Sequence, residues 1–223
     1  MILVPVKNFE NAKQRLSPVL DAAERTALAK AMFEDVMAAL AQCPSKPEVS
    51  IVTGDSHART VARGRGFSII EDQENRSETD AIAMASAVCE SHGVKSVMVV
   101  PADIPLISAS EVEKVLAHAP QEGSVLVPAA DRRGTNAILK SPINLFPLRF
   151  GNDSFQPHLA SAKATGKPVI VLELPGIALD IDRPDDLAQL LSAPIRTRTQ
   201  RLLASWNLSE RLQQVSSTRS AHA

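Results

Sequence analysis

The sequence of 223 residues contains no tyrosine, and aromatic residues make up only 3% of it. Few side chains are therefore present on which unpaired bases could stack, which argues against single-stranded nucleic acid as a partner. The 24 basic and 25 acidic residues nearly cancel, so no overall field favours nucleic acid or an anionic membrane surface. Any basic binding site must be local, and we expect neither nucleic acid nor a membrane among the partners.

Cysteine and long apolar runs are also scarce. Cys43 and Cys89 lie in apolar helical contexts and lack the number and spacing of a disulfide framework or a zinc site. No apolar stretch approaches the length of a membrane span, and the first residues lead into a predicted strand without a signal-peptide pattern. These features predict a cytoplasmic protein with buried, reduced thiols.

Several familiar catalytic motifs are missing. The sequence has no G-x-x-x-x-G-K-[ST] phosphate loop, and no G-x-G-x-x-G follows the first predicted strand. No G-x-S-x-G elbow suggests a hydrolase, and the histidines at 57, 92, 118 and 158 lack metal-binding spacing. A P-loop enzyme, a dinucleotide-binding Rossmann site, a serine hydrolase of this type and a histidine metal site are therefore not expected.

The strongest positive feature is the apolar run at residues 97–100, followed by Pro101-Ala102-Asp103-Ile104-Pro105. A β-branched apolar run predicts a buried strand. The flanking prolines restrict the backbone around Asp103, which would present its carboxylate at the carboxyl end of the strand, where open α/β sheets bind ligands. An aspartate in an ordinary turn after a strand is the competing interpretation.

Strand and helix patterns alternate along the chain, which predicts right-handed βαβ units and a largely parallel sheet with helices on both faces. The last two strands before residue 140 are expected to pair as an antiparallel hairpin. The predicted strands are residues 1–6, 49–53, 67–70, 97–100, 124–130, 135–139 and 168–174, and the predicted helices are 21–42, 56–65, 79–91, 108–118, 155–166 and one from 184 onward.

We predict a single α/β domain over residues 1–191, followed by an extension over 192–223. An amphipathic piece at about 200–215 would pack either on the domain or on a second subunit, and the end of the tail is expected to be disordered. The sequence leaves open whether the protein is a monomer or a homodimer.

The segment after the first predicted strand carries three cations, Lys7, Lys13 and Arg15, without helical apolar periodicity. Lysine supplies a mobile point charge and arginine a planar fork of donors, so Lys13 and Arg15 suit a polyphosphate. A solvated surface loop is the competing interpretation, and it is the better one for Lys7 considered alone.

Two later segments add candidate binding groups. Asp180 and Asp182 alternate in an extended piece and so share one face. Gly151 permits close backbone approach, and Ser154 precedes a predicted helix whose N–H groups favour an anion. A plain helix cap is the competing interpretation of Ser154. Cations for phosphates and paired carboxylates that suit Mg²⁺ together indicate phosphoryl or nucleotidyl transfer.

In order, six segments resemble the 2-phospho-L-lactate guanylyltransferase family, which acts in the biosynthesis of the deazaflavin coenzyme F-420. The Asp-Ile-Pro-Leu and Asp-Ile-Asp-x-Pro-x-Asp-Leu pieces also recur in nucleotidyltransferases of the glycosyltransferase-A-like, Rossmann-like fold. The segments are Val4-Pro5-Val6-Lys7, Ala12-Lys13-Gln14-Arg15-Leu16-Ser17, Pro101-Ala102-Asp103-Ile104-Pro105-Leu106, Gly134-Thr135-Asn136-Ala137, Phe150-Gly151-Asn152-Asp153-Ser154-Phe155 with His158, and Asp180-Ile181-Asp182-Arg183-Pro184-Asp185-Asp186-Leu187.

The resemblance implies a reaction in which GTP and 2-phospholactate, phosphoenolpyruvate or 3-phosphoglycerate give a guanylylated diphosphate and pyrophosphate. It also implies that Lys13 and Arg15 steady the triphosphate and that Asp103, with Asp182 or Asp180, holds Mg²⁺. Thr135, Gly151 and Ser154 would grip the phosphate or carboxylate of the acceptor. Lys7, Ser77 and Asp80 are further candidates for contacts with the nucleotide.

One departure from the family pattern concerns the base. The family commonly has Gly-Leu-Asn at the start of the helix after the third strand, whereas this chain has Arg76-Ser77-Glu78-Thr79-Asp80. An aspartate keeps an acceptor for guanine N1 and N2 hydrogens but lacks the amide donor. Two alternatives stay open: a molybdenum-cofactor-type nucleotidyltransferase, against which the glycine-free segment 7–17 argues, and a non-catalytic nucleotide-binding domain, against which Asp103 and Asp182 argue.

Overall fold

The computed structural model describes residues 1–74, 76–151, 153–194, 197–206, 208 and 211–212. These residues form a seven-stranded sheet in the order β3-β2-β1-β4-β6-β5-β7. All strands run parallel except β6, which is antiparallel to both of its neighbours. The strands are β1 (Ile2–Val6), β2 (Val49–Thr53), β3 (Ser68–Glu71), β4 (Val97–Val99), β5 (Gly123–Pro128), β6 (Thr135–Ser141) and β7 (Val169–Val171).

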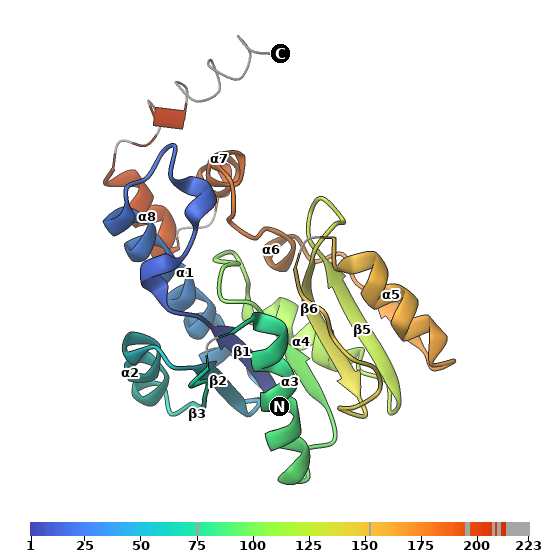
Figure 1. Ribbon diagram of the computed structural model, residues 1–223. Coiled ribbons are helices and arrows are strands. Elements are labelled where there is room, and N and C mark those ends of the chain that lie inside the picture. The colour runs from blue at the N-terminus through green and yellow to red at the C-terminus, as the bar shows by residue number, and fades with distance from the viewer. Residues whose placement is uncertain (75, 152, 195–196, 207, 209–210, 213–223) are drawn as a thin grey trace.

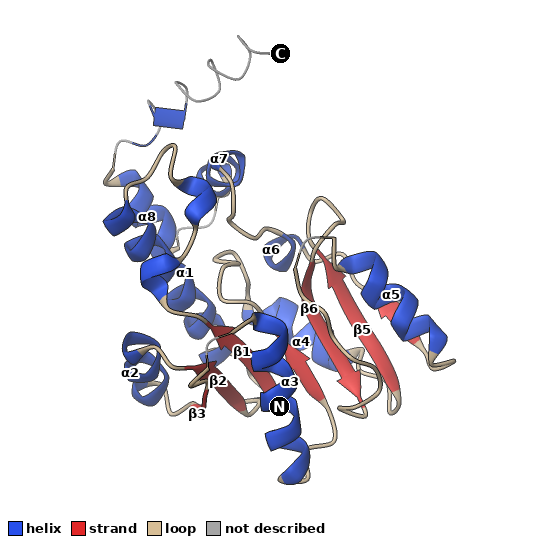
Figure 2. Cartoon of the chain, in the orientation of Figure 1, coloured by secondary structure: helices blue, strands red, loops and turns tan. Residues whose placement is uncertain are grey.

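Helices cover both faces of this sheet, which confirms the predicted α/β class (Figure 1, Figure 2). Side chains of β1 alternate between two cores, with Ile2, Val4 and Val6 in one and Leu3 in the other. The helices are α1 (Ala22–Ala41), α2 (Ser56–Gly64), α3 (Glu78–Ser91), α4 (Ala109–Ala117), α5 (Phe155–Ala164), α6 (Pro175–Ala178), α7 (Pro184–Ser192) and α8 (Arg198–Ala204), with two 3₁₀ turns, η1 (Phe9–Asn11) and η2 (Gln14–Leu16).

A capping box closes the start of α1, the helix predicted over residues 21–42. The Asp21 carboxylate accepts from the Glu24 N–H at 2.8 Å, and the Glu24 carboxylate accepts from the Asp21 N–H at 2.9 Å. Two backbone donors at the helix end are thus paired within the chain. The predicted hairpin is also present, since β5 pairs antiparallel with β6 from Gly123 opposite Ser141 to Pro128 opposite Thr135.

The region after β5 and β6 differs in detail from the prediction. A single strand was expected over 168–174, but β7 ends at Val171 and α6 begins at Pro175. Proline cannot donate to a sheet ladder and suits the first helical turn, which accounts for the helix at that point. The two 3₁₀ turns lie in a segment that the sequence indicated only as a loop.

Helix α8 lies beside α1 of the same chain (Figure 1). The Asp35 carboxylate on α1 accepts from the N–H groups of Arg198 and Thr199 at 2.9 and 2.8 Å, which satisfies donors at the start of α8. The amphipathic piece therefore packs on the domain from residue 198, while residues 213–215 and the tail expected to be disordered lie outside the described residues. The boundary at residue 191 remains a prediction.

Among the helices in the described ranges, none combines the length and the apolar character needed to cross a bilayer.

Candidate active site

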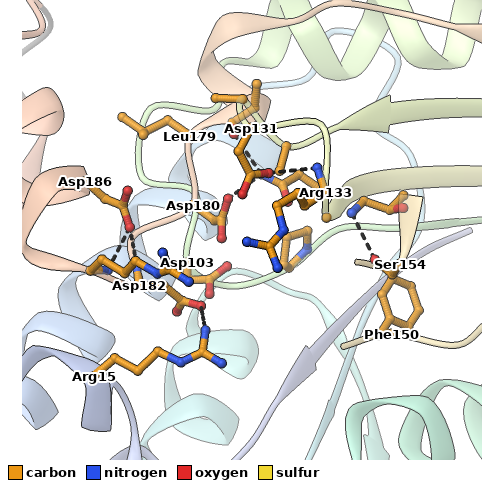
Figure 3. Close-up of a pocket in the computed structure, with 18 of the residues that line it drawn as sticks. Arg15, Asp103, Asp131, Arg133, Phe150, Ser154, Leu179, Asp180, Asp182 and Asp186 are labelled. Atoms are coloured by element: carbon orange, nitrogen blue, oxygen red, sulfur yellow. Dashed lines mark hydrogen bonds and ion pairs between the residues drawn. The ribbon is translucent and has the colours of Figure 1, made fainter. Parts of the chain in front are cut away.

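A cavity of about 760 Å³ opens where β1 and β4 end. Because β6 is antiparallel to β4, its first residue, Thr135, lies at this same edge of the sheet. Loops after β1, β4 and α6 contribute charged side chains to the cavity, and the start of β6 and the segment before α5 contribute hydroxyl groups. Figure 3 shows Asp103, Asp180 and Asp182 near Arg15, with Ser154 across the cavity.

Lys13 is the centre of the charged half of the cavity. Its Nζ lies 2.6 Å from Oδ2 of Asp103 and 2.8 Å from Oδ1 of Asp182, and only 9% of its side chain is exposed. The backbone of Lys13 is left-handed, with φ 55°, a conformation that costs a side-chain-bearing residue about 1 kcal/mol. Two ion pairs over sequence separations of 90 and 169 residues therefore hold this lysine in place.

The charges of this cluster stabilise one another. Burial acts to lower the pKa of Lys13, but the carboxylates of Asp103 and Asp182 outweigh it and hold that pKa well above its usual range. Burial likewise acts to raise the pKa of Asp182, and Lys13 and Arg15 more than reverse this. Arg15 Nη1 lies 3.3 Å from Asp182 Oδ2. We call Lys13, Arg15, Asp103 and Asp182 the charged cluster.

Backbone hydrogen bonds fix the two aspartate loops to each other. The N–H of Ile181 donates to the carbonyl of Asp103 at 3.1 Å. The Asp186 carboxylate accepts from the N–H groups of Asp182 and Arg183, at 2.9 and 2.7 Å, and so anchors the turn before α7. The loops that carry Asp103 and Asp182, the two candidate metal ligands, are thus joined by a backbone hydrogen bond.

Asp180 and Asp182 have different surroundings. Asp182 points to Lys13, whereas Asp180 accepts from the amide of Asn136 at 3.0 Å. Burial, together with the Asp103 carboxylate, raises the pKa of Asp180 to about 6. Asn136 also donates to the carbonyls of Ile177 and Ala178. This asparagine fixes the loop that carries Asp180, a role that sequence reasoning did not assign.

The opposite half of the cavity carries the hydroxyl groups of Thr135 and Ser154, and the imidazole of His158 lies behind them. We call these three side chains the hydroxyl cluster. All three are buried, with 6%, 5% and 1% of each residue exposed. Ser154 Oγ accepts from the Thr135 N–H at 3.1 Å and makes no capping hydrogen bond to α5. In the described structure, the Ser154 side chain therefore does not cap α5, which was the competing interpretation of this residue.

Gly151 lies beside this cluster and has a φ of +134°. A side chain rarely adopts that backbone conformation, and nothing lies within 4 Å of the place where a Cβ would stand. The backbone is thus open to close approach on the cavity side, as the sequence predicted. Arg133 pairs with Asp153 next to it, with Nη2 and Oδ2 3.1 Å apart.

A second cavity, of about 470 Å³, adjoins the first, and Lys13, Glu78 and Asp103 line both. It also contains Lys7 and Ser77, which brings two predicted nucleotide contacts together. Lys7 Nζ lies 3.2 Å from Asp72 Oδ2. Ser77 caps α3, because its Oγ accepts from the Asp80 N–H at 3.0 Å. Asp80 is exposed, and its carboxylate accepts from the Ser77 hydroxyl at 2.6 Å.

Glu78 was not singled out by the sequence, where it reads as an ordinary acidic residue in the first turn of a helix. It lies between the two cavities. Burial, with the Asp103 carboxylate nearby, raises the pKa of Glu78 to about 7. A carboxyl group that is about half protonated near pH 7 repels a polyanionic ligand less than an ordinary glutamate does, and no signal in the sequence indicated this.

The donor set of the charged cluster fits a divalent metal ion. Carboxylate oxygens of Asp103 and Asp182 converge within 2.8 Å of a single cationic atom, the Lys13 ammonium. Hard oxygen donors of this kind are those that Mg²⁺ prefers, usually through one or two carboxylates together with substrate phosphates.

Comparison with known proteins places this arrangement in context. Residues 1–222 match the family model described as guanylyl transferase CofC like. The chain is 39% identical over 200 residues to the phosphoenolpyruvate guanylyltransferase of Roseiflexus castenholzii, covering 90% of this chain and 91% of the relative. It is 34% identical to the 2-phospho-L-lactate guanylyltransferase of Methanothermobacter thermautotrophicus, covering 85% and 82%.

A third relative, the 3-phospho-D-glycerate guanylyltransferase of Colwellia psychrerythraea, is 31% identical over 90% of this chain and 96% of its own length. Among solved structures, a putative nucleotide-diphospho-sugar transferase from Desulfovibrio desulfuricans superposes with a TM-score of 0.76 at 22% identity and covers 96% of both chains. At that identity the likeness supports the fold, and the sequence relatives carry the information on activity.

Proposed function

The chain belongs to the CofC-like guanylyl transferase family, and from this membership we propose that it transfers GMP from GTP to the phosphate of a small phosphorylated acid. The acids named for its relatives are phosphoenolpyruvate, 2-phospho-L-lactate and 3-phospho-D-glycerate. The product would be a guanylylated diphosphate, released with pyrophosphate and used in the biosynthesis of coenzyme F-420. The enzyme is a nucleotidyltransferase.

The observation that carries this proposal is the convergence of Lys13, Asp103 and Asp182 opposite two hydroxyl groups in one cavity. Lys13 and Arg15 would contact the triphosphate, because an ammonium and a guanidinium are the side chains that best match phosphate oxygens. Asp103 and Asp182 would hold Mg²⁺, which neutralises charge on the phosphates when it is bound. Asp180, held by Asn136, supports the loop beside them.

Base and acceptor would lie on opposite sides of the charged cluster. The second cavity, with Lys7 and Ser77, adjoins Lys13 and has room for a base and ribose. Thr135, Gly151 and Ser154 would bind the acceptor acid in the larger cavity. Asp80 remains a candidate for base recognition, and its carboxylate accepts from the hydroxyl of Ser77, the residue that caps α3.

The chemistry requires positioning more than proton transfer. An oxygen of the acceptor phosphate bonds to the α-phosphorus of GTP, and the bond from that phosphorus to the β-phosphate oxygen breaks, so that pyrophosphate leaves with the electron pair. The second pKa of a phosphomonoester is about 6, so the attacking oxygen is already ionised near pH 7. Lys13 and Arg15 would then accelerate the reaction by aligning the triphosphate and neutralising its negative charge.

A direct assay tests this function. The protein is incubated with Mg²⁺, each of the four ribonucleoside triphosphates and each of the three acids, and both pyrophosphate and the nucleotidylated acid are measured. We expect GTP with at least one acid to give both products in equal amounts. Failure of every acid to stimulate pyrophosphate release would refute the proposal, and a preference for another triphosphate would refute guanylyl transfer while leaving nucleotidyl transfer in place.

A further inference from the structure

His158 lies behind the acceptor side of the cavity, and the resemblance that includes it assigns it no role. It stands on α5 with 1% of its surface exposed, and it is not among the residues that line either cavity in the described structure. Its Nδ1 lies 2.9 Å from the hydroxyl oxygen of Thr135. Its Nε2 accepts from the backbone N–H of Arg149, also at 2.9 Å. Both ring nitrogens are thus engaged.

These two contacts fix the proton on the ring. The Arg149 N–H can only donate, so Nε2 must be the unprotonated acceptor nitrogen. Burial, with some help from the Lys140 ammonium, lowers the pKa of His158 to about 4, so the ring is neutral near pH 7 and carries one proton. That proton lies on Nδ1 and is donated to Thr135 Oγ1. The Phe150 ring packs against the imidazole at an interplanar angle of 68°, with the ring centroids 5.3 Å apart.

The orientation of the Thr135 hydroxyl follows from this. Its oxygen accepts from His158, so its own hydrogen is left to donate, and within the described chain no protein oxygen accepts it. Ser154 is in a similar position, because its Oγ accepts from the Thr135 N–H. Both residues line the cavity. The cavity wall therefore offers two hydroxyl hydrogens side by side, which is the pattern that an oxygen anion requires.

We propose that His158 is a positioning residue that holds the Thr135 hydroxyl as a donor to an anionic oxygen of the acceptor acid. The proposal rests on the proposed function, since it deepens the account of the same site. A neutral imidazole supplies this orientation without adding a charge behind the acceptor side of the cavity. His158 touches no reacting atom and acts through Thr135.

Steady-state kinetics with phosphoenolpyruvate and GTP test the proposal. In His158→Leu the hydroxyl is free to turn away, and we expect the KM for phosphoenolpyruvate to rise about tenfold, as for the loss of one oriented hydrogen bond. The KM for GTP should change by less than about twofold. His158→Asn keeps an amide near the Nδ1 position and should recover part of the loss. Equal increases in both KM values would indicate general damage to the site and overturn the proposal.

A double-mutant cycle isolates the path through Thr135. Thr135→Val removes the hydroxyl, so adding His158→Leu should change the phosphoenolpyruvate KM by less than about twofold more. Additive effects of the two substitutions would contradict the proposal. Thr135→Ser keeps the hydroxyl and should remain sensitive to His158→Leu. Ser161→Ala, a substitution on the same helix and outside both cavities, is the matched control.

An NMR measurement on the wild-type protein separates this inference from the proposed function. Long-range ¹H–¹⁵N correlation of the histidine rings, with the His158 signal assigned from its loss in His158→Asn, should show a neutral ring protonated at Nδ1 and bare at Nε2 at pH 7.5. A proton on Nε2 would overturn the inference even in an active enzyme. If no acid is guanylylated, the proposed function fails, and calorimetric binding of phosphoenolpyruvate to wild type and His158→Leu still decides whether His158 orients an anion site.

Discussion

The charged cluster and the hydroxyl cluster face each other across one cavity, but they are held together by different forces. In the charged cluster, Lys13, Asp103 and Asp182 form ion pairs between residues far apart in the sequence. In the hydroxyl cluster, Thr135, Ser154 and His158 are joined by neutral hydrogen bonds within 23 residues of one another. The charged cluster therefore depends on ion pairs between distant segments. The hydroxyl cluster depends on hydrogen bonds between the start of β6 and the start of α5.

This difference matches the two substrates. A triphosphate carries several negative charges, which an ammonium and a guanidinium can neutralise. A small acid with one phosphate and one carboxylate must also be distinguished from similar acids, and oriented hydroxyl donors discriminate by geometry. Variants in the charged cluster should therefore affect turnover, while variants in the hydroxyl cluster should affect acceptor binding.

The largest effect is expected for Asp103→Asn. The amide keeps the size of the side chain but removes the charge that faces Lys13 at 2.6 Å and that would hold Mg²⁺. We expect kcat to fall by roughly 10²- to 10³-fold, with the circular dichroism spectrum unchanged. Glu122→Gln, which removes a charge from the start of β5, is the matched control. Wild-type turnover in Asp103→Asn would show that Asp103 is not a metal ligand. It would also contradict the expectation that variants in the charged cluster affect turnover.

A smaller loss is expected for Lys13→Gln, about 10²-fold in kcat/KM for GTP, because a neutral amide stabilises the triphosphate poorly. The substitution also removes the cation that lies between Asp103 and Asp182, while Asp182 keeps its ion pair with Arg15. Added Mg²⁺ should therefore raise Tm more in Lys13→Gln than in the wild type, since binding to the native state adds stability. Equal Mg²⁺ responses in the two proteins would mean that the lysine and the metal ion do not share these carboxylates.

The sequence predicted the charged cluster better than the hydroxyl cluster for a physical reason. Parallel strands end at one edge of a sheet, so charged residues that follow strands, such as Lys13 and Asp103, are expected to meet there. Thr135 was reached only through resemblance, because a threonine in a strand has an ordinary structural explanation. The residues alone left Ser154 open between an anion site and a plain helix cap. His158 looked like an unassociated histidine, since spacing along the chain does not reveal contact with a strand 23 residues earlier.

The fold was predictable for a related reason. Alternation of strand and helix patterns indicates parallel pairing, and all seven strands appeared near their predicted positions. The position of β6 between β4 and β5 was not predicted, because a hairpin can add to a sheet by either of its strands. Because β6 is the strand that pairs with β4, Thr135 lies at the sheet edge where Asp103 also lies. Local sequence patterns do not predict this strand order.

On the hydroxyl side, Ser154→Ala should raise the acceptor KM about tenfold, as expected for the loss of one hydrogen bond from a hydroxyl to an anionic oxygen. It should leave the KM for GTP unchanged, which is the opposite of the pattern for Lys13→Gln. The Thr135 N–H loses its acceptor as well, so Tm should fall. Ser161→Ala is the control. An unchanged acceptor KM together with a lower Tm would limit Ser154 to supporting the backbone of Thr135.

The smallest expected effect is a pH dependence of the unfolding free energy that arises from the titration of His158 in the hydroxyl cluster. The pKa of His158 is lowered to about 4 by burial and by Lys140, from 6.5. The unfolded chain therefore binds more protons between these values, and stability that is complete above about pH 6.5 is lost as the pH falls toward 4. Protonated Nε2 would also oppose the Arg149 N–H.

This predicts a loss of about 1 kcal/mol from His158 at pH 5.5 relative to pH 7.5. Urea unfolding of the wild type and His158→Asn at both pH values measures it, because other titrating groups are common to the two proteins and cancel in the difference. The wild type should be the more stable protein at pH 7.5, and its advantage should narrow at pH 5.5. If the difference in unfolding free energy between the two proteins is the same at both pH values, His158 has the same pKa in the folded and unfolded chains. That result would contradict the burial of His158 described above.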